Sequence, residues 1–127
     1  LLTTEQIALP FDYGCFIIKN SQLKTKRDDL KRVLRATIAA YDLAIQEPAL
    51  AKRIIGKYTR TTDSETLDAT YKENLKDYAL RVPYVSLAGL NSILEFRAES
   101  AAEVKKLSLE KMFDNSLLQE IQKEMTK

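Results

Sequence analysis

A chain of 127 residues fits one domain, in which folding buries roughly two-thirds of the surface of the unfolded chain. Apolar residues make up 45% and charged residues 30%, a balance typical of a globular protein and not of a disordered one. Twenty Lys and Arg against eighteen Asp and Glu leave a net charge of +2, which argues against the concentrated basic face that nucleic-acid binding needs. No apolar run approaches the roughly 18 residues of a membrane span.

Residue types that carry chemistry are scarce in this chain. It has no His, which excludes Ser-His-Asp and Cys-His catalysis and removes the commonest metal ligand. Cys15 is the only cysteine, so no internal disulfide can form, and the apolar residues 16–18 that follow predict a buried thiol rather than a reactive one. The glycines are isolated and form no phosphate-binding loop. We therefore expect no catalytic residues, no metal and no cofactor.

Residues 13–19 form a nearly continuous apolar run after Pro10, which predicts a strand buried on both faces. Such a strand needs neighbours in a sheet, and no second strand of comparable quality follows. The chain also begins inside the run L-L-T-T, which is not a signal peptide. We therefore expect either that the chain is a fragment or processed chain whose sheet partners precede Leu1, or that the strand Tyr13 to Lys19 pairs with a second copy.

A polar and basic loop is expected over 20–27, and a helix over about 29–46 follows it, with Asp28 or Asp29 as the N-cap. Its apolar residues recur at spacings of three and four, which places them on one buried stripe. This stripe contains Leu30, Val33, Leu34, Ile38, Tyr41 and Ile45. The cations Lys31, Arg32 and Arg35 lie off the stripe, which predicts a solvated face, with a phosphate-binding face as the alternative.

Four further helices follow from start signals. Pro48 suits the first turn of a helix over about 48–58, with Leu50, Ile54, Ile55 and Tyr58 as its apolar stripe. The capping box of residues 62–65 predicts a helix over about 63–79, and Ser86 can cap one over about 86–98. A second capping box predicts a short helix over about 100–107.

The last helix is expected over about 115–125, with Asp114 as its cap, after a possible turn of helix within 108–113. Its apolar stripe consists of Leu117, Leu118, Ile121 and Met125. The sequence thus predicts a mainly α fold of about five to six helices with one N-terminal strand, in a single segment over residues 1–127.

The order of these elements resembles the C-terminal part of type II periplasmic binding proteins of ABC importers, in particular the group that binds thiamine precursors or taurine, sulfonates and nitrate. No single motif is specific, but their order and spacing match over most of the chain. The matching stretches are Gly14 to Ile18, Val33 to Ala36 with Ala40, Pro48 to Thr59, Asp63 with Leu67 and Tyr71, Val82 to Tyr84, Ser86 to Leu94 and Asp114 to Ile121.

The resemblance implies the C-terminal segment of a two-lobed α/β fold that closes on a small organic molecule or anion and delivers it to an ABC permease. It implies a periplasmic or extracytoplasmic location and no bond chemistry. It places Asp12 and Tyr13 near the ligand cleft as candidate binding residues; strand entry and packing are the alternative roles for both. Most of the cleft would lie in a part of the protein that precedes this chain.

Two other classes stay open on the residues alone. The first is a helical dimerisation or interaction module, stand-alone or fused to a receptor, which would use the strand and the helix stripes to pair. The second is an enzyme whose catalytic groups are all carboxylates, with separated pKa values. The carboxylate pairs Asp28/Asp29 and Glu120/Glu124 lie at a helix start and on a polar helix face, so we expect capping and solvation for them.

Overall fold

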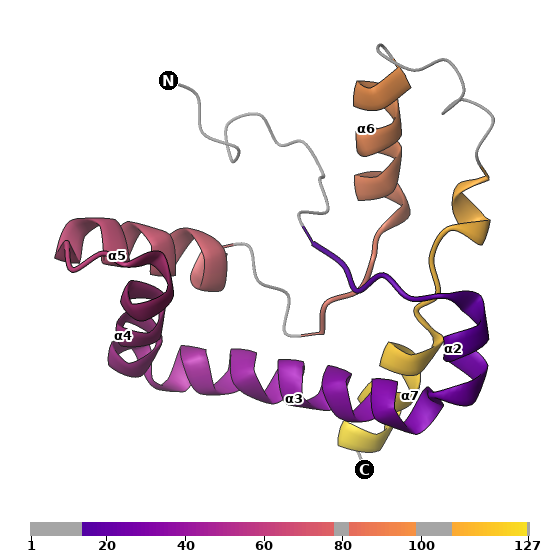
Figure 1. Ribbon diagram of the computed structural model, residues 1–127, viewed down its shortest axis with the longest axis horizontal. Helices are drawn as coiled ribbons and strands as arrows, with labels where there is room; N and C mark the ends of the chain where they lie inside the picture. The colour runs from indigo at the N-terminus through magenta and orange to yellow at the C-terminus, as the bar shows by residue number, and fades with distance from the viewer. Residues whose placement is uncertain (1–13, 78–81, 99–107, 127) are drawn as a thin grey trace.

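The computed structural model describes residues 14–77, 82–98 and 108–126, and this part of the chain is mainly helical (Figure 1). It contains six α-helices: α2 (Asn20–Thr25), α3 (Arg27–Gln46), α4 (Pro48–Thr59), α5 (Ser64–Tyr71), α6 (Leu87–Ala98) and α7 (Ser116–Met125). A π-helix, η1 (Lys72–Asp77), continues α5, and a 3-10 helix, η3 (Leu109–Lys111), precedes α7.

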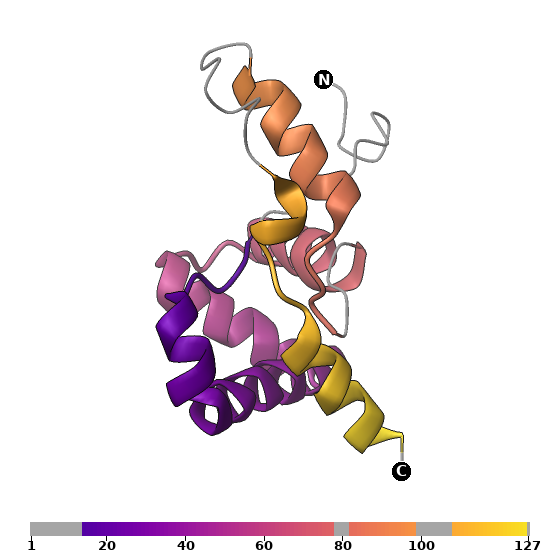
Figure 2. The same ribbon diagram turned by 90° about the vertical axis from the view of Figure 1, so that its right-hand side faces the viewer.

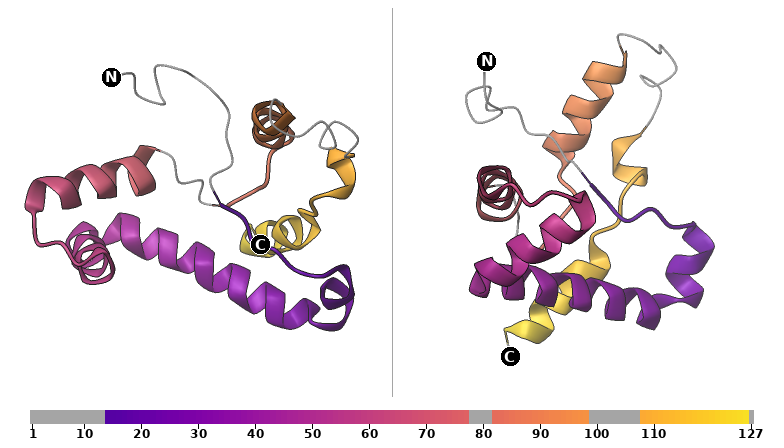
Figure 3. Two further views of the ribbon diagram at one scale, coloured as in Figure 1. Left: turned by 45° about the horizontal axis from the view of Figure 1, so that its top comes forward. Right: turned by 60° about the vertical axis from the view of Figure 1, so that its left-hand side comes forward.

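The 20-residue helix α3 forms one edge of the molecule and carries most of the other elements. Helices α4 and α5 stack at its C-terminal end, whereas α2 and α7 lie toward its N-terminal end (Figures 1 and 3). Helix α6 projects away from this base and packs only with η3 among the described elements (Figure 2). The described part of the chain is therefore an open arrangement around one long helix.

Four helices lie within two residues of where the sequence predicts them, namely α3, α4, α6 and α7. The helix predicted over 63–79 begins as α5 and widens into η1, and its last two residues lie outside the described part. The helix predicted over 100–107 also lies outside it. The loop predicted over 20–27 is wrong, because α2 occupies Asn20–Thr25.

Local capping explains several of these boundaries. The Asp63 carboxylate accepts a hydrogen bond from the Thr66 N–H at 2.7 Å, so Asp63 caps α5 and the cap predicted at residue 62 is off by one. The Ser86 hydroxyl accepts from the Gly89 N–H at 2.9 Å and caps α6 as predicted. Asp28 and Asp29 lie inside the first turn of α3 rather than at its N-cap. There their negative charges still interact favourably with the positive end of the helix dipole.

The predicted strand over residues 13–19 is not observed in its described part. Residues 14–19 run without regular structure, and among the described residues there is no strand at all. Their side chains are exposed, including Ile17 at 90% and the Cys15 thiol, so the buried position predicted for Cys15 is also wrong. An apolar run becomes a strand only when a neighbour takes up its backbone hydrogen bonds, and the described residues offer none.

The main core forms where α7 crosses α3. Ile38 of α3 and Leu118 and Ile121 of α7 are 2%, 6% and 0% exposed and pack together. Val82 and Tyr84, from the segment before α6, cover this contact. Burying each of the three central side chains contributes about 1.5–3 kcal/mol, so this junction contributes substantially to the stability of the described fold.

A second packing centre joins α4 to α5 through a close turn. Gly56 lies under the Thr61 carbonyl oxygen, which a Cβ at residue 56 would approach to 2.8 Å. The Thr61 N–H also donates to the Gly56 carbonyl at 3.2 Å, and Arg60 reverses the chain direction with a φ of 58°. The turn can return α5 onto α4 because residue 56 has no side chain.

Several side chains predicted for buried stripes are instead about half exposed or more. Val33 and Ile45 of α3 are about half exposed, at 49% and 50%, and Tyr58 of α4 is 78% exposed. The periodicity predicted the helices correctly but could not show that the described part of the chain covers only one face of α3. None of the described helices is long and apolar enough to span a membrane.

Candidate functional site

The two residues that the resemblance places near a ligand cleft, Asp12 and Tyr13, lie outside the described residues. The structure therefore neither joins them to other polar groups nor separates them from such groups. Within the described ranges the places with functional potential are a charged ladder between α3 and α7, a polar cluster on α4 and α5, and exposed apolar side chains.

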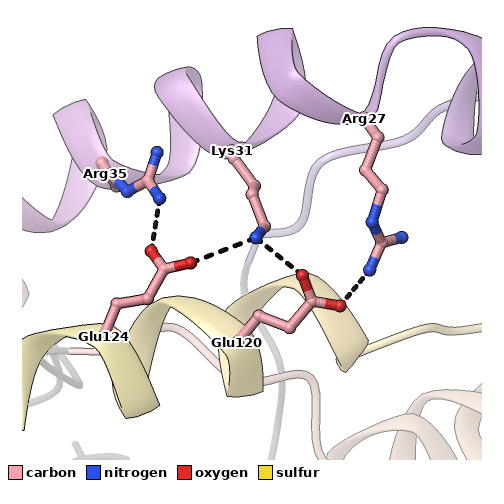
Figure 4. A network of polar contacts seen from close by, with 5 residues as sticks. All are labelled: Arg27, Lys31, Arg35, Glu120 and Glu124. Carbon is pink, nitrogen blue, oxygen red and sulfur yellow. Dashed lines mark hydrogen bonds and ion pairs between the residues drawn. The ribbon is translucent and has the colours of Figure 1, made fainter.

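The charged ladder connects the N-terminal half of α3 to the outer side of α7 (Figure 4). Lys31 lies in its centre, with its Nζ 2.7 Å from the Glu120 carboxylate and 3.2 Å from that of Glu124. Arg27 pairs with Glu120 on one side, and Arg35 pairs with Glu124 on the other. Three cations one helical turn apart thus alternate with two carboxylates one turn apart.

The ladder shifts the pKa of each central group toward its charged form. The hydrogen bond from Lys31 lowers the pKa of Glu120, and the hydrogen bonds from Arg35 and then Lys31 lower that of Glu124. The hydrogen bonds to Glu120 and Glu124 raise the pKa of Lys31. A general acid needs a raised carboxyl pKa, so this pair of carboxylates has the opposite tuning. The ladder suits helix registration rather than proton transfer.

The ladder corrects two predictions from the sequence. Lys31 and Arg35 do not form a merely solvated face, because they bind the carboxylates of α7. Glu120 and Glu124 likewise have partners rather than water alone. The sequence carried a signal for this contact, since a four-residue spacing of cations in one helix matches a four-residue spacing of acids in another.

A second polar cluster ties α5 to α4 and to the end of α3. Lys52 of α4 lies 2.6 Å from the Asp68 carboxylate and 5.5 Å from the centre of the Tyr71 ring. The Tyr71 hydroxyl donates to the Ala44 carbonyl at 3.2 Å. Every member has a partner inside the cluster, so its geometry supports packing rather than ligand binding.

A shallow hollow on α7 offers little to a ligand. It has a volume of about 370 Å³ and is lined by four polar side chains of α7 and its C-cap, namely Gln119, Gln122, Lys123 and Thr126. Ligand sites usually combine apolar walls with convergent polar groups from several elements. In the described ranges no group of three or more acidic, Cys or His side chains could hold a metal ion.

The exposed apolar side chains are the feature with the clearest functional potential. Twelve large apolar side chains of the described residues are exposed, whereas five apolar residues are buried. The exposed set contains Phe16, Ile17, Ile18, Val33, Leu43, Ile45, Ile54, Tyr58, Leu87, Phe96, Met112 and Met125. Single exposed apolar residues are normal, but twelve exposed against five buried in the described part leave more apolar surface in water than a closed core would.

The main prediction from the sequence assigned several of these residues to a closed core, whereas the alternative of a helical interaction module left the strand and the helix stripes free to pair. The only signal for the exposed surface was an excess of apolar stripes over the partners available to cover them. Comparisons of this chain with protein-family models, with curated proteins and with solved structures found no match.

Proposed function

We propose that this chain is a non-catalytic binding component whose helices complete a hydrophobic core together with protein surface outside its described residues. The observation that carries this proposal is the excess of exposed over buried large apolar side chains in the described part. Leaving such surface in water forgoes about 25 cal/mol per Å² of burial, so a covering surface would stabilise the molecule substantially.

The first candidate for the specific function is the substrate-binding component of an ABC importer, of which this chain would be the C-terminal segment. The order of motifs from Gly14 to Ile121 supports it. The exposed, apolar stretch 14–19 supports it as well, because it would enter a sheet built by other residues of the same protein. Two lobes would then close about a hinge on a small organic molecule or anion, with Asp12 and Tyr13 near the cleft.

The test of this candidate uses the protein in the length in which its natural source produces it. Intact mass and N-terminal sequencing should find a heavier chain with residues before Leu1. Calorimetric titration of that protein with taurine, nitrate and a thiamine precursor should then show binding of one of them. A natural chain that begins near Leu1 would contradict this candidate, and a longer one that binds none of the three would contradict its assignment to this group of binding proteins.

The second candidate is a helical interaction module that pairs with another protein chain. The observation that favours it is that exposed apolar side chains occur on α3, α4 and α6 as well as in residues 16–18. This candidate predicts that the chain self-associates in solution. Light scattering at concentrations well above micromolar would contradict it by showing a single monomeric species.

A further inference from the structure

The long helix α3 has a second apolar stripe opposite the one that faces α7. Leu34 and Ile38 face the core, whereas Val33 and Leu43 are 49% and 48% exposed on another side of the helix. Ala36 and Ala40 are exposed between them. The spacing of 33, 36, 40 and 43 is three, four and three residues, which is the spacing of a helix-pairing seam. We call these four residues the outer stripe of α3.

The outer stripe is nearly symmetric about position 38. Val33 and Leu43 lie five residues on either side of it, and Ala36 and Ala40 lie two residues on either side. In a two-fold dimer the same patch of each copy contacts the other, so residue i meets residue j and j meets i. A stripe that reads alike in both directions meets this condition when two α3 helices pack antiparallel.

We propose that the outer stripe of α3 is the surface on which a second copy of this chain packs, antiparallel and centred on position 38. Val33 then contacts Leu43 of the second copy, and Ala36 contacts its Ala40. The small central side chains let the two helix axes approach to about 8 Å, the near end of the usual range. The larger side chains close the two ends of the contact.

The charges of α3 favour this antiparallel direction over a parallel one. Arg27, Lys31 and Arg35 bind the carboxylates of α7 on the opposite side of the helix, so Arg32 is the cation beside the outer stripe at its N-terminal end, and Glu47 is an acid at its C-terminal end. Antiparallel packing therefore brings this cation toward the acid of the second copy, whereas parallel packing would set like charges side by side. Arg32, whose side chain is 74% exposed and 2.6 Å from Asp29, comes within one helical turn of Glu47 of the second copy. It would then lie between two carboxylates.

The contact is small, which sets the expected strength. Twenty residues of helix are about 30 Å long, and one helix pair of that length lies near or below the ~1,200 Å² at which stable interfaces begin. We therefore expect a reversible dimer that forms with rising concentration, rather than a permanent one. The inference rests on the second candidate above, the interaction module, and names its partner.

Sedimentation equilibrium of the chain and of its Ala40→Glu variant tests the stripe. The substitution is on the surface of the monomer, so the fold should persist, but it places an unpaired charge in the centre of the dimer. We expect dimerisation to weaken on the order of 10- to 100-fold. Ala49→Glu, at an exposed position in the first turn of α4, is the matched control and should dimerise like the unmodified chain.

Cross-linking tests the direction of packing. In a Cys15→Ser background, oxidation of a mixture of Val33→Cys and Leu43→Cys chains should give the mixed disulfide dimer. Either variant alone should give none, because the two copies of the same position would be offset by ten residues, about 15 Å along the axis. Disulfides within each single variant but not between them would show parallel packing and overturn the inference.

The variant Ile17→Asp separates failure of this inference from failure of the interaction module. Ile17 is 90% exposed and lies outside α3. If Ala40→Glu leaves the dimer intact while Ile17→Asp abolishes it, the interface lies in residues 14–19 and the inference is wrong, although the module stands. If the unmodified chain stays monomeric at all concentrations, both are wrong.

Discussion

The side-chain amide of Asn115 hydrogen-bonds to both backbone polar groups of Val85, accepting from its N–H at 3.2 Å and donating to its carbonyl oxygen at 2.8 Å. The amide thus takes the place that a neighbouring strand would have beside Val85. It joins the start of α7 to the segment that leads into α6, two parts of the chain that are 30 residues apart.

Asn115→Ala should therefore destabilise the protein. Both Val85 groups are partly buried, and losing their partner should cost about 1 to 2 kcal/mol in the free energy of unfolding. Urea unfolding followed by circular dichroism would measure this. Asn91→Ala is the control, since Asn91 is exposed on α6 and its side chain hydrogen-bonds to the exposed Glu95 of the same helix, so it should change stability by less than about 0.5 kcal/mol.

Ile121→Ala should be the most destabilising substitution in α7. Ile121 is 0% exposed and packs against Ile38 and Leu118, so its truncation leaves a cavity at the main junction. The expected loss is about 2 to 5 kcal/mol, measured by the same urea unfolding. Met125→Ala removes a long apolar side chain that is 44% exposed on the same helix, and its cost should be clearly smaller. Equal losses would mean that α7 is not anchored through Ile121.

Gly56→Ala should destabilise, although Ala normally stabilises a helix by about 1 kcal/mol relative to Gly. The new Cβ would lie 2.8 Å from the Thr61 carbonyl oxygen, which belongs to the backbone and cannot rotate away. We expect a net loss of about 1 to 2 kcal/mol, since overpacking costs about 1 to 3 kcal/mol. Gly14→Ala is the control, because a Cβ there meets no atom within 4 Å and should be nearly neutral.

The ladder between α3 and α7 should make stability depend on pH at both extremes. The pKa values of Glu120 and Glu124 are lowered in the folded protein, so their contribution is present above the ordinary value of 4.5 and is lost as pH falls through the folded values. The pKa of Lys31 is raised, so its contribution is present below 10.5 and is lost as pH rises through the folded value. Between about pH 5 and 10 the contribution should be constant.

Urea midpoints measured from pH 2 to 7 would check the acid side. The double variant Glu120→Gln with Glu124→Gln should lose less stability on acidification than the unmodified chain does. Some acid dependence should remain, because hydrogen bonds from Thr66 and Ser116 lower the pKa values of Asp63 and Asp114. Asp29→Asn is the control, as the exposed Asp29 pairs with the exposed Arg32 of the same helix. If the urea midpoints of the double variant and of the unmodified chain fell equally on acidification, the contribution of the ladder to stability would be contradicted.

Local signals predicted the helices well because helix formation depends on nearby residues. Pro48 at the first position of α4 and Ser86 before α6 marked helix starts that the structure has. The apolar stripe of α7 was likewise correct for Leu117, Leu118 and Ile121. These features depend on caps and periodicity, which the sequence states directly.

The predictions that were wrong concern contacts between residues that are far apart in the chain. Residues 14–19 have strand composition but no neighbouring strand in the described part, and composition cannot supply one. Periodicity placed Val33 and Ile38 on one stripe, yet only Ile38 meets α7. The sequence pattern could not predict the role of the Asn115 amide, because its partner is the backbone of Val85 and every residue has such a backbone. Whether Asp12 and Tyr13 bind a ligand stays a prediction.

The placement of α7 and α4 on different parts of α3 has a mechanical consequence. Among the described elements, α7 packs only against α3, and the α4–α5 group also reaches the rest of the fold through α3. A continuous α-helix is stiff over its roughly 30 Å, so a force applied at one end tilts the whole rod. A displacement at the ladder would therefore rotate the polar cluster around Tyr71 as a rigid body. Thermal unfolding of the elements at one end of α3 need not unfold those at the other end.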